Sequence, residues 1–187
     1  MILWSIEEMA GKECFSLAHD APAPWSRFAP EYQHGQIPVP GLRGTMAESV
    51  KGVWEGMKLI GPKGKVGRMN PGYFTGPGRD RPVKNGEWFS GFSFGGRAIG
   101  HKDALKLIFL PTYLWTIQNH CPDLMGNIKV LARDQDVWLY DGNASVDLFD
   151  DTMPLSHAAI VVAFLNNVMD DFQRGYYPHS LMGSILQ

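Results

Sequence analysis

The sequence predicts an α+β fold: a single compact domain over residues 1–187, with several helices around a small sheet. The chain has 187 residues, and 44% of them are hydrophobic, so it can bury an apolar core without a disulfide or a metal. Charged residues make up 19%, which is too few for a disordered chain. Some apolar side chains recur at helical spacing, whereas residues 136–140 have the pattern of a buried strand.

The first predicted helix covers residues 48–58. Thr45 and Glu48 have the spacing of a capping box, in which each side chain bonds to the backbone N–H of the other residue, so a helix is expected to start there. An apolar stripe follows at helical spacing, formed by Val50, Val53, Trp54 and Met57. We therefore expect Trp54 to be buried, and Gly61-Pro62 to end the helix.

The later elements are predicted from turn residues and apolar patterns. Residues 61–100 are rich in Gly and Pro and predict a long basic loop followed by short strands or turns. Proline at a first helical position predicts helices over residues 111–119 and 122–132. Residues 136–140 predict a strand, and the last helix is expected to begin at Pro154.

Composition excludes several classes of protein. The longest apolar runs fall well short of the roughly 20 residues that a membrane-spanning helix needs. The N-terminus lacks the basic start of a signal peptide, so we expect a cytoplasmic protein. The two cysteines, Cys14 and Cys121, are too few for a disulfide framework, and the six histidines have no metal-ligand spacing. We therefore expect no metal and no cofactor; the sequence does not indicate an oligomeric state.

Charge is unevenly distributed along the chain, although the net charge is only -2. Seven basic residues lie between Lys58 and Lys84, against the single acid Asp80. Acidic residues dominate the C-terminal half. The basic stretch is suited to phosphate groups, and aromatic side chains within and after it, among them Trp88, could stack on a base.

A second stripe of the first predicted helix is polar and consists of Glu48, Lys51, Glu55 and Lys58. One interpretation is a solvated face on which Lys51 pairs with Glu55 and Glu48, with each pair contributing only a few tenths of a kcal/mol. The other is that these side chains form a functional site.

The second interpretation rests on a resemblance. Ser49-Val50-Lys51-Gly52-Val53-Trp54-Glu55-Gly56-Met57-Lys58 resembles the helix motif of the NADAR family, in which a Thr/Ser-x-Glu start is followed by an aromatic, a Gln, a small residue and a Lys. Upstream, Trp25-Ser26-Arg27-Phe28-Ala29-Pro30 is similar to the Phe-Ser-Asn-Phe-x-Pro segment of that family. In order of elements the resemblance extends over residues 25–165.

The resemblance implies an α+β fold and cleavage of an N-glycosidic bond, in a nucleotide, an ADP-ribose conjugate or a modified nucleic-acid base. Such a reaction passes through an oxocarbenium-like state that a carboxylate can stabilise. The glutamate of the family motif falls at Lys51 here, and its glutamine falls at Glu55. Glu55 or Glu48 would therefore have to supply the carboxylate, with Lys51 as a partner and Asp151 as a further acidic candidate.

The resemblance also suggests binding residues. Lys58 matches the motif lysine and, together with Arg68, could hold a phosphate through charge-assisted hydrogen bonds. The remaining candidates for contact with the ligand are Ser26, Arg27, Phe28, Trp54 and Trp88. His157 follows Ser156 directly, so the two side chains point apart on a helix, and we expect His157 to be a packed or capping residue.

Three functions stay open. The first is an N-glycosidase-type hydrolase. The second is a binding module for a nucleotide or ADP-ribose, a sensor, sponge or inhibitor that lost the catalytic carboxylate. The third is a protein that interacts with nucleic acid through its basic loop.

Overall fold

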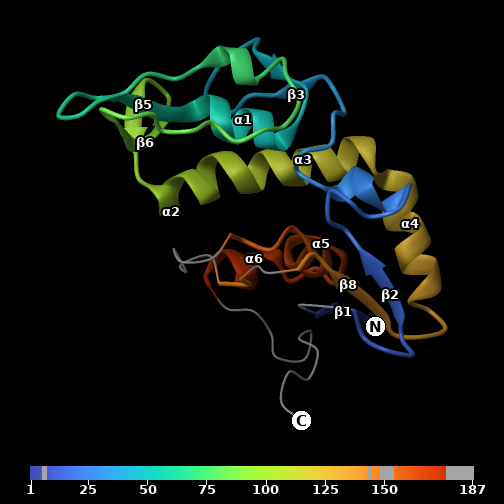
Figure 1. Cartoon of the computed structure of the whole chain (residues 1–187). Helices are drawn as coiled ribbons and strands as arrows, with labels where there is room; N and C mark the ends of the chain where they lie inside the picture. The colour runs from blue at the N-terminus through green and yellow to red at the C-terminus, as the bar shows by residue number, and fades with distance from the viewer. Residues whose placement is uncertain (6–7, 143–144, 148–153, 176–187) are drawn as a thin grey trace. The chain divides into compact units, whose positions relative to one another are not determined.

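The computed structural model describes residues 1–5, 8–142, 145–147 and 154–175 (Figure 1). The chain divides into two compact units, one made of Met1–Ala29 with Cys121–Gln187 and the other of Pro30–His120, and each is described by itself. Both helices and strands are present, so the predicted α+β class is confirmed. The prediction that the whole chain is one domain stays a prediction.

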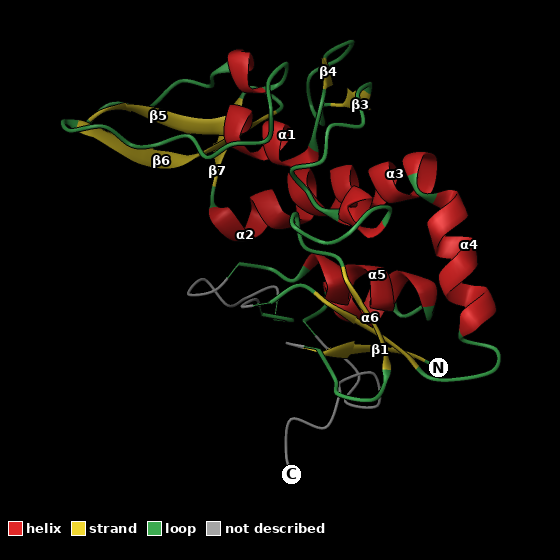
Figure 2. Cartoon of the chain, turned by 45° about the vertical axis from the view of Figure 1, so that its right-hand side comes forward, coloured by secondary structure: helices red, strands yellow, loops and turns green. Residues whose placement is uncertain are grey.

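A three-stranded parallel sheet forms the centre of the first unit. Its order is β1 (Ile2–Ser5), β8 (Val137–Tyr140) and β2 (Glu13–Ser16), and both outer strands run parallel to β8. The predicted strand at residues 136–140 is therefore confirmed. Helix α5 (His157–Leu165) packs against β1 and β8 (Figure 2). Seven of its nine residues are buried, as expected for a helix that is apolar on nearly all sides.

The start of α5 differs from the prediction. The helix begins at His157 and not at Pro154, because the side chain of Ser156 accepts a hydrogen bond from the backbone N–H of Ala159 at 3.0 Å and acts as the N-cap. The indole N–H of Trp4 in β1 donates to the same hydroxyl oxygen at 2.9 Å. This hydrogen bond connects the N-cap of α5 to strand β1.

Helices η1, α6 and α4 also belong to this unit. The 3-10 helix η1 (Trp25–Phe28) follows β2, and α6 (Met169–Gln173) follows α5. Helix α4 (Pro122–Leu131) confirms the helix predicted at residues 122–132, with proline at its first position.

The second unit combines an antiparallel sheet with helices. Strands β5 (Lys58–Pro62), β6 (Glu87–Phe94) and β7 (Arg97–Ile99) pair in that order, and a bulge interrupts the β5–β6 register between Lys58 and Ile60. Strands β3 (Ile37–Pro38) and β4 (Met46–Ala47) form a separate antiparallel pair. The segment between β5 and β6 contains the 3-10 helix η2 (Pro71–Tyr73).

Helix α1 (Val50–Met57) is shorter than predicted and starts differently. The expected capping box is wrong, because pairing of β4 with β3 holds the backbone next to Thr45 in an extended form. Ser49 is the N-cap, and its hydroxyl accepts from the N–H of Gly52 at 2.9 Å. At the other end the helix does not run to Gly61-Pro62, because β5 begins directly at Lys58.

Two glycines of α1 allow the last residue of η2 and the residue that follows it to pack closely. A Cβ atom on Gly52 would lie 2.7 Å from the carbonyl oxygen of Tyr73, and one on Gly56 would overlap the ring of Phe74. Phe74 is buried against this face of the helix. Gly52 and Gly56, the small residues of the segment that resembles the NADAR helix motif, are therefore required for close packing.

A long helical segment covers α1 from another side. It consists of α2 (His101–Ala104), a π-helical stretch η3 (Leu105–Phe109) and α3 (Leu110–His120), which follow one another directly (Figures 1 and 2). The helix predicted at residues 111–119 is confirmed. Both η3 and α3 contact α1. Among the described residues, no helix combines the length and apolar character required to cross a bilayer.

Candidate functional site

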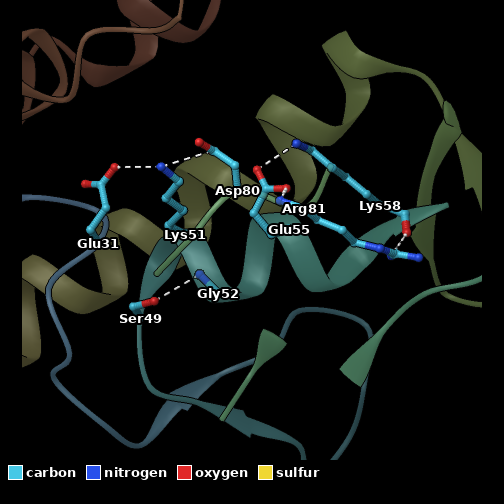
Figure 3. A network of polar contacts seen from close by, with 8 residues as sticks. All are labelled: Glu31, Ser49, Lys51, Gly52, Glu55, Lys58, Asp80 and Arg81. Carbon is cyan, nitrogen blue, oxygen red and sulfur yellow. Dashed lines mark hydrogen bonds and ion pairs between the residues drawn. The ribbon is translucent and has the colours of Figure 1, made fainter. Parts of the chain in front are cut away.

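Three residues of the predicted polar stripe fall into two groups of charges, one around Lys51 and one that contains Glu55 and Lys58 (Figure 3). The carboxylate of Glu55 accepts hydrogen bonds from the ammonium of Lys58 at 2.6 Å and from the backbone N–H of Arg81 at 2.9 Å. Lys51, one turn earlier, instead pairs with Glu31 and Asp80, each at 3.1 Å. The predicted pairing of Lys51 with Glu55 and Glu48 is wrong, because segments outside the helix supply the partners.

Glu55 is deeply buried for a charged residue, with only 3% of its side chain exposed. A buried carboxylate is costly unless a counter-charge and hydrogen bonds compensate it. Here one oxygen faces the Lys58 ammonium and the other faces the Arg81 N–H. Both oxygens are thereby engaged within the protein.

Arg81 connects this pair to the segment around Arg68, and its role was not predicted from the sequence. Its guanidinium donates to the carbonyl of Lys58 at 2.7 Å and to the carbonyl of Arg68 at 3.0 Å. The one signal in the sequence is its position next to Asp80, the only acid in the basic stretch. Both residues contact α1 directly: Asp80 pairs with Lys51, and the backbone N–H of Arg81 donates to Glu55.

Lys51 is held in its charged form. Partial burial by itself lowers the pKa of Lys51, but hydrogen bonds to Asp80 and Glu31 and the negative charges of both outweigh burial, so the pKa is raised above its usual value. The backbone N–H of Lys51 also donates to the carbonyl of Pro30 at 2.8 Å. This group fixes the segments around residues 30 and 80 to the start of α1.

A pocket of about 220 Å³ opens beside Lys58. Cationic, aromatic and aliphatic side chains line it: Trp54, Lys58, Ile60, Arg81, Val83, Phe89, Phe92 and His101. Lys58 was expected to line the largest polar pocket. It does line a pocket, but a crevice of about 400 Å³ along residues 38–46 is larger. That crevice is formed by one stretch of chain and contains one charged residue, Arg43.

Trp54 is half-buried, so the expectation that it is a buried core residue is wrong. Its ring lies 4.1 Å from the ring of Phe92 and meets the rings of His101 and Phe109 edge-on at 5.5 and 5.7 Å. The part of the indole that remains accessible forms a wall of the pocket. Trp54 thus belongs to the site as well as to the core.

The other predicted site residues of this unit lie outside the pocket. Glu48, Lys51 and Glu55 are absent from the described residues that line it. Glu48 precedes α1 in the chain and is half-buried. Its backbone N–H donates to the carbonyl of Phe74. Arg68 is exposed and contributes its carbonyl to Arg81, and Trp88 is exposed on β6 with its indole N–H bonded to the carbonyl of Lys65 at 2.8 Å.

Three predicted binding residues belong to the first unit. Ser26, Arg27 and Phe28 lie in η1, where Phe28 is buried and the guanidinium of Arg27 pairs with Asp123 at 2.8 Å. Phe28 is therefore engaged in packing, and Arg27 is engaged in an ion pair. Asp151 lies outside the described residues.

A buried charge is also present in the first unit, at Asp141, in addition to Glu55 of the second unit. Its carboxylate accepts from the hydroxyl of Ser156 at 2.8 Å, the N–H of Ala158 at 3.0 Å and Nδ1 of His157 at 2.9 Å. Nε2 of His157 lies 2.8 Å from the carbonyl of Leu17, so both ring nitrogens face acceptors, as in a protonated imidazole. His157, which we expected to be a packed or capping residue, is half-buried and bonds to Asp141 and Leu17 within the protein, while Ser156 is the N-cap.

Asp141 is ionised in this arrangement. Burial raises the pKa of Asp141, but the charge of His157 and the three hydrogen bonds outweigh burial and lower it. The Ser156 hydroxyl donates to the carboxylate and accepts from Trp4 and Ala159, so it is not activated by His157. The cluster connects the start of α5 to the ends of β2 and β8.

Comparison with protein families identifies the chain. Residues 5–161 match the family of unknown function DUF6939, and the protein belongs to this family. No curated protein and no solved structure matches the chain. Within the described part of the chain, no group of three or more His, Cys, Asp and Glu side chains could hold a metal ion.

Proposed function

We propose that the protein is a binding module for a nucleotide or ADP-ribose, of the kind that its resemblance to NADAR proteins implies, and that the pocket beside Lys58 is its ligand site. The observation that supports this most directly is the combination of Lys58 and Arg81 with the rings of Trp54, Phe89 and Phe92 around one pocket. Cations attract phosphate, and aromatic faces stack on a base.

The size of the pocket suggests which part of the ligand lies inside it and which part lies outside. Sites that enclose a whole drug-sized ligand usually measure about 300–1,000 Å³. A pocket of about 220 Å³ is smaller and suits one ring system, with the remainder of the ligand extending over the rim. The base would contact Trp54 and Phe92, while a phosphate would reach the ammonium of Lys58 and the N–H groups of Arg81 that do not bind carbonyls.

The state of Glu55 favours binding over catalysis. A carboxylate that stabilises an oxocarbenium-like transition state must face the anomeric carbon of the ligand. In this structure both oxygens of Glu55 bind groups of the protein, and its charge is compensated by Lys58. Lys51, at the position of the family glutamate, is engaged with Glu31 and Asp80.

One observation keeps hydrolysis as a second candidate. Glu55 and a pocket-lining cation are in direct contact, so a ligand phosphate that binds Lys58 would compete with Glu55 for the same ammonium. A carboxylate oxygen released in this way could stabilise positive charge at an anomeric carbon. The enzyme would then be an N-glycosidase-type hydrolase in which the ligand itself frees the catalytic group.

Calorimetric titration with ADP-ribose and AMP tests the binding proposal. The double variant Glu55→Gln/Lys58→Gln removes both charges and keeps two groups able to hydrogen-bond, so it should fold and bind at least tenfold more weakly if Lys58 holds the phosphate. Lys129→Gln, on an exposed face of α4, is the matched control and should bind like wild type. Absence of binding to wild type, or equal binding by all three proteins, would contradict the proposal.

Turnover assays separate the two candidates. Release of free base or ribosyl product is measured with nucleotides and with ADP-ribosylated nucleic acid, for wild type and Glu55→Gln. Binding without turnover supports the module. Turnover that Glu55→Gln abolishes would establish the hydrolase, because an amide cannot supply the negative charge.

A further inference from the structure

The segment between β5 and β6 carries positive charge that the rest of the described structure does not neutralise. The basic side chains of this segment without an ion pair among the described residues are Lys63, Lys65, Arg68, Arg79, Arg81 and Lys84; of these, the guanidinium of Arg81 bonds to the carbonyls of Lys58 and Arg68. Of the nearby acids, Asp80 is paired with Lys51, and Glu87 accepts from the backbone N–H of Lys84. These free cations form a region of positive potential on a chain whose net charge is slightly negative.

Hydrogen bonds that involve main-chain atoms hold the segments that carry three of these lysines, and the indole of Trp88, at the end of the β5–β6 hairpin. The N–H of Lys63 donates to the carbonyl of Gly86 at 3.2 Å, and the indole of Trp88 donates to the carbonyl of Lys65 at 2.8 Å. Lys84 and Glu87 exchange two further bonds, at 2.9 and 3.0 Å. We call Lys63, Lys65, Lys84 and Trp88 the hairpin patch.

Trp88 differs from the aromatic residues of the pocket. Its residue exposure is 41%, and Trp88 is not among the described residues that line the pocket beside Lys58. The hydrogen bond to Lys65 holds the indole by its edge, which leaves the ring able to stack. A large aromatic residue that is 41% exposed, bonded to the backbone of Lys65 on a hairpin rich in lysine, suggests a surface that meets a partner.

We propose that the hairpin patch binds single-stranded nucleic acid, with phosphates on Lys63, Lys65 and Lys84 and a base stacked on Trp88. Proteins that bind single strands without sequence preference combine a cationic track with aromatic faces, because every nucleotide carries both a phosphate and a stacking base. The patch provides both. A membrane surface fits less well, because interfacial binding requires a broad apolar face that enters the lipid. This proposal is independent of the ligand in the pocket beside Lys58.

Fluorescence anisotropy with a labelled oligothymidylate of about 12 nucleotides, within the range of site sizes of single-strand binders, tests the proposal over a series of salt concentrations. For the variant Lys63→Gln/Lys65→Gln/Lys84→Gln we expect binding at least tenfold weaker, and a plot of log K against log salt that is less steep by about 2, since each phosphate contact contributes about 0.7. Trp88→Leu should weaken binding about fivefold or more with little change in this slope, whereas Trp88→Phe should keep most of the affinity.

The matched control is Lys12→Gln/Lys129→Gln/Arg133→Gln, which changes the net charge equally at exposed residues of the first unit. It should bind the oligonucleotide like wild type. Equal losses in the two triple variants would show that net charge alone matters and would overturn the proposal. Failure of wild type to bind the oligonucleotide would also overturn it, as would lysine-dependent binding only to vesicles of phosphatidylglycerol and phosphatidylcholine.

A parallel AMP titration separates this surface from the pocket. The hairpin triple variant should bind AMP like wild type if the pocket takes a nucleotide, because none of the three lysines lines it. Its melting temperature should also stay unchanged, since these side chains make no ion pair that the substitution could break. Loss of oligonucleotide binding with an intact fold supports the hairpin patch even if wild type does not bind AMP. Loss of AMP binding by the triple variant alone would contradict a surface separate from the pocket.

Discussion

The ammonium of Lys58 lies 2.6 Å from the carboxylate of Glu55, although α1 ends between the two residues and Lys58 is already the first residue of β5. The change from helix to strand keeps the lysine close enough to compensate the buried acid. It also leaves Lys58 at the wall of a pocket, where Glu55 is not exposed. One residue thereby serves stability and the candidate site together.

The first prediction concerns this pair. Lys58→Met should lower the free energy of unfolding by roughly 3–5 kcal/mol, because it leaves a buried carboxylate without its counter-charge. Glu55→Gln/Lys58→Met should cost much less than the sum of the single changes. Urea denaturation of the four proteins in a double-mutant cycle measures the coupling. Additive effects would mean that the pair is not compensating in solution.

The second prediction concerns Trp54. Because the ring is half-buried, Trp54→Ala should lower the free energy of unfolding by about 2–3 kcal/mol, below the 3–5 kcal/mol typical of a fully buried tryptophan. Trp54→Phe should retain most of the stability. Thermal and urea denaturation measure both variants. A loss as large as that of a core tryptophan would show that the ring is covered and cannot line a pocket.

The third prediction tests the close packing of α1. Gly56→Ala should destabilise by about 1–3 kcal/mol, since the added methyl group overlaps the ring of Phe74. The matched control is Gly126→Ala in α4, where an added Cβ meets nothing within 4 Å. That change should stabilise by up to about 1 kcal/mol, because alanine favours a helix. Similar melting temperatures for the two variants would contradict the packing argument.

The fourth prediction concerns pH. The pKa of Asp141 is lowered in the folded protein, so the unfolded chain takes up the proton first as pH falls. The stabilisation by Asp141 is therefore present above the unfolded pKa of about 3.9 and is lost as pH falls through the lower folded pKa. Asp141→Asn should cost more stability at pH 7 than at pH 3, as measured by urea denaturation. An equal cost at both pH values would show that the charge does not contribute.

Local signals in the sequence were sufficient for much of the secondary structure. Proline at the first position and an apolar pattern located α4, and a short buried run located β8. These features depend on residues close together in the chain, so their physics can be evaluated from the sequence. The capping box at Thr45 shows the limit, because pairing of Met46 and Ala47 with β3 competes for the same backbone and Ser49 caps the helix instead.

The sequence by itself determined which charged and aromatic residues are available and that Glu55, Lys51 and Lys58 project from one short segment. Only the tertiary structure decided their partners. Lys51 meets Glu31 and Asp80, and Glu55 meets Arg81, through loops 20 to 29 residues away along the chain. Helical spacing predicts neighbours on the same helix, but a buried charge binds whichever donor the fold brings closest. The pocket beside Lys58 arises in the same way, because its walls come from α1, β5, β6, α2 and the segment before β6.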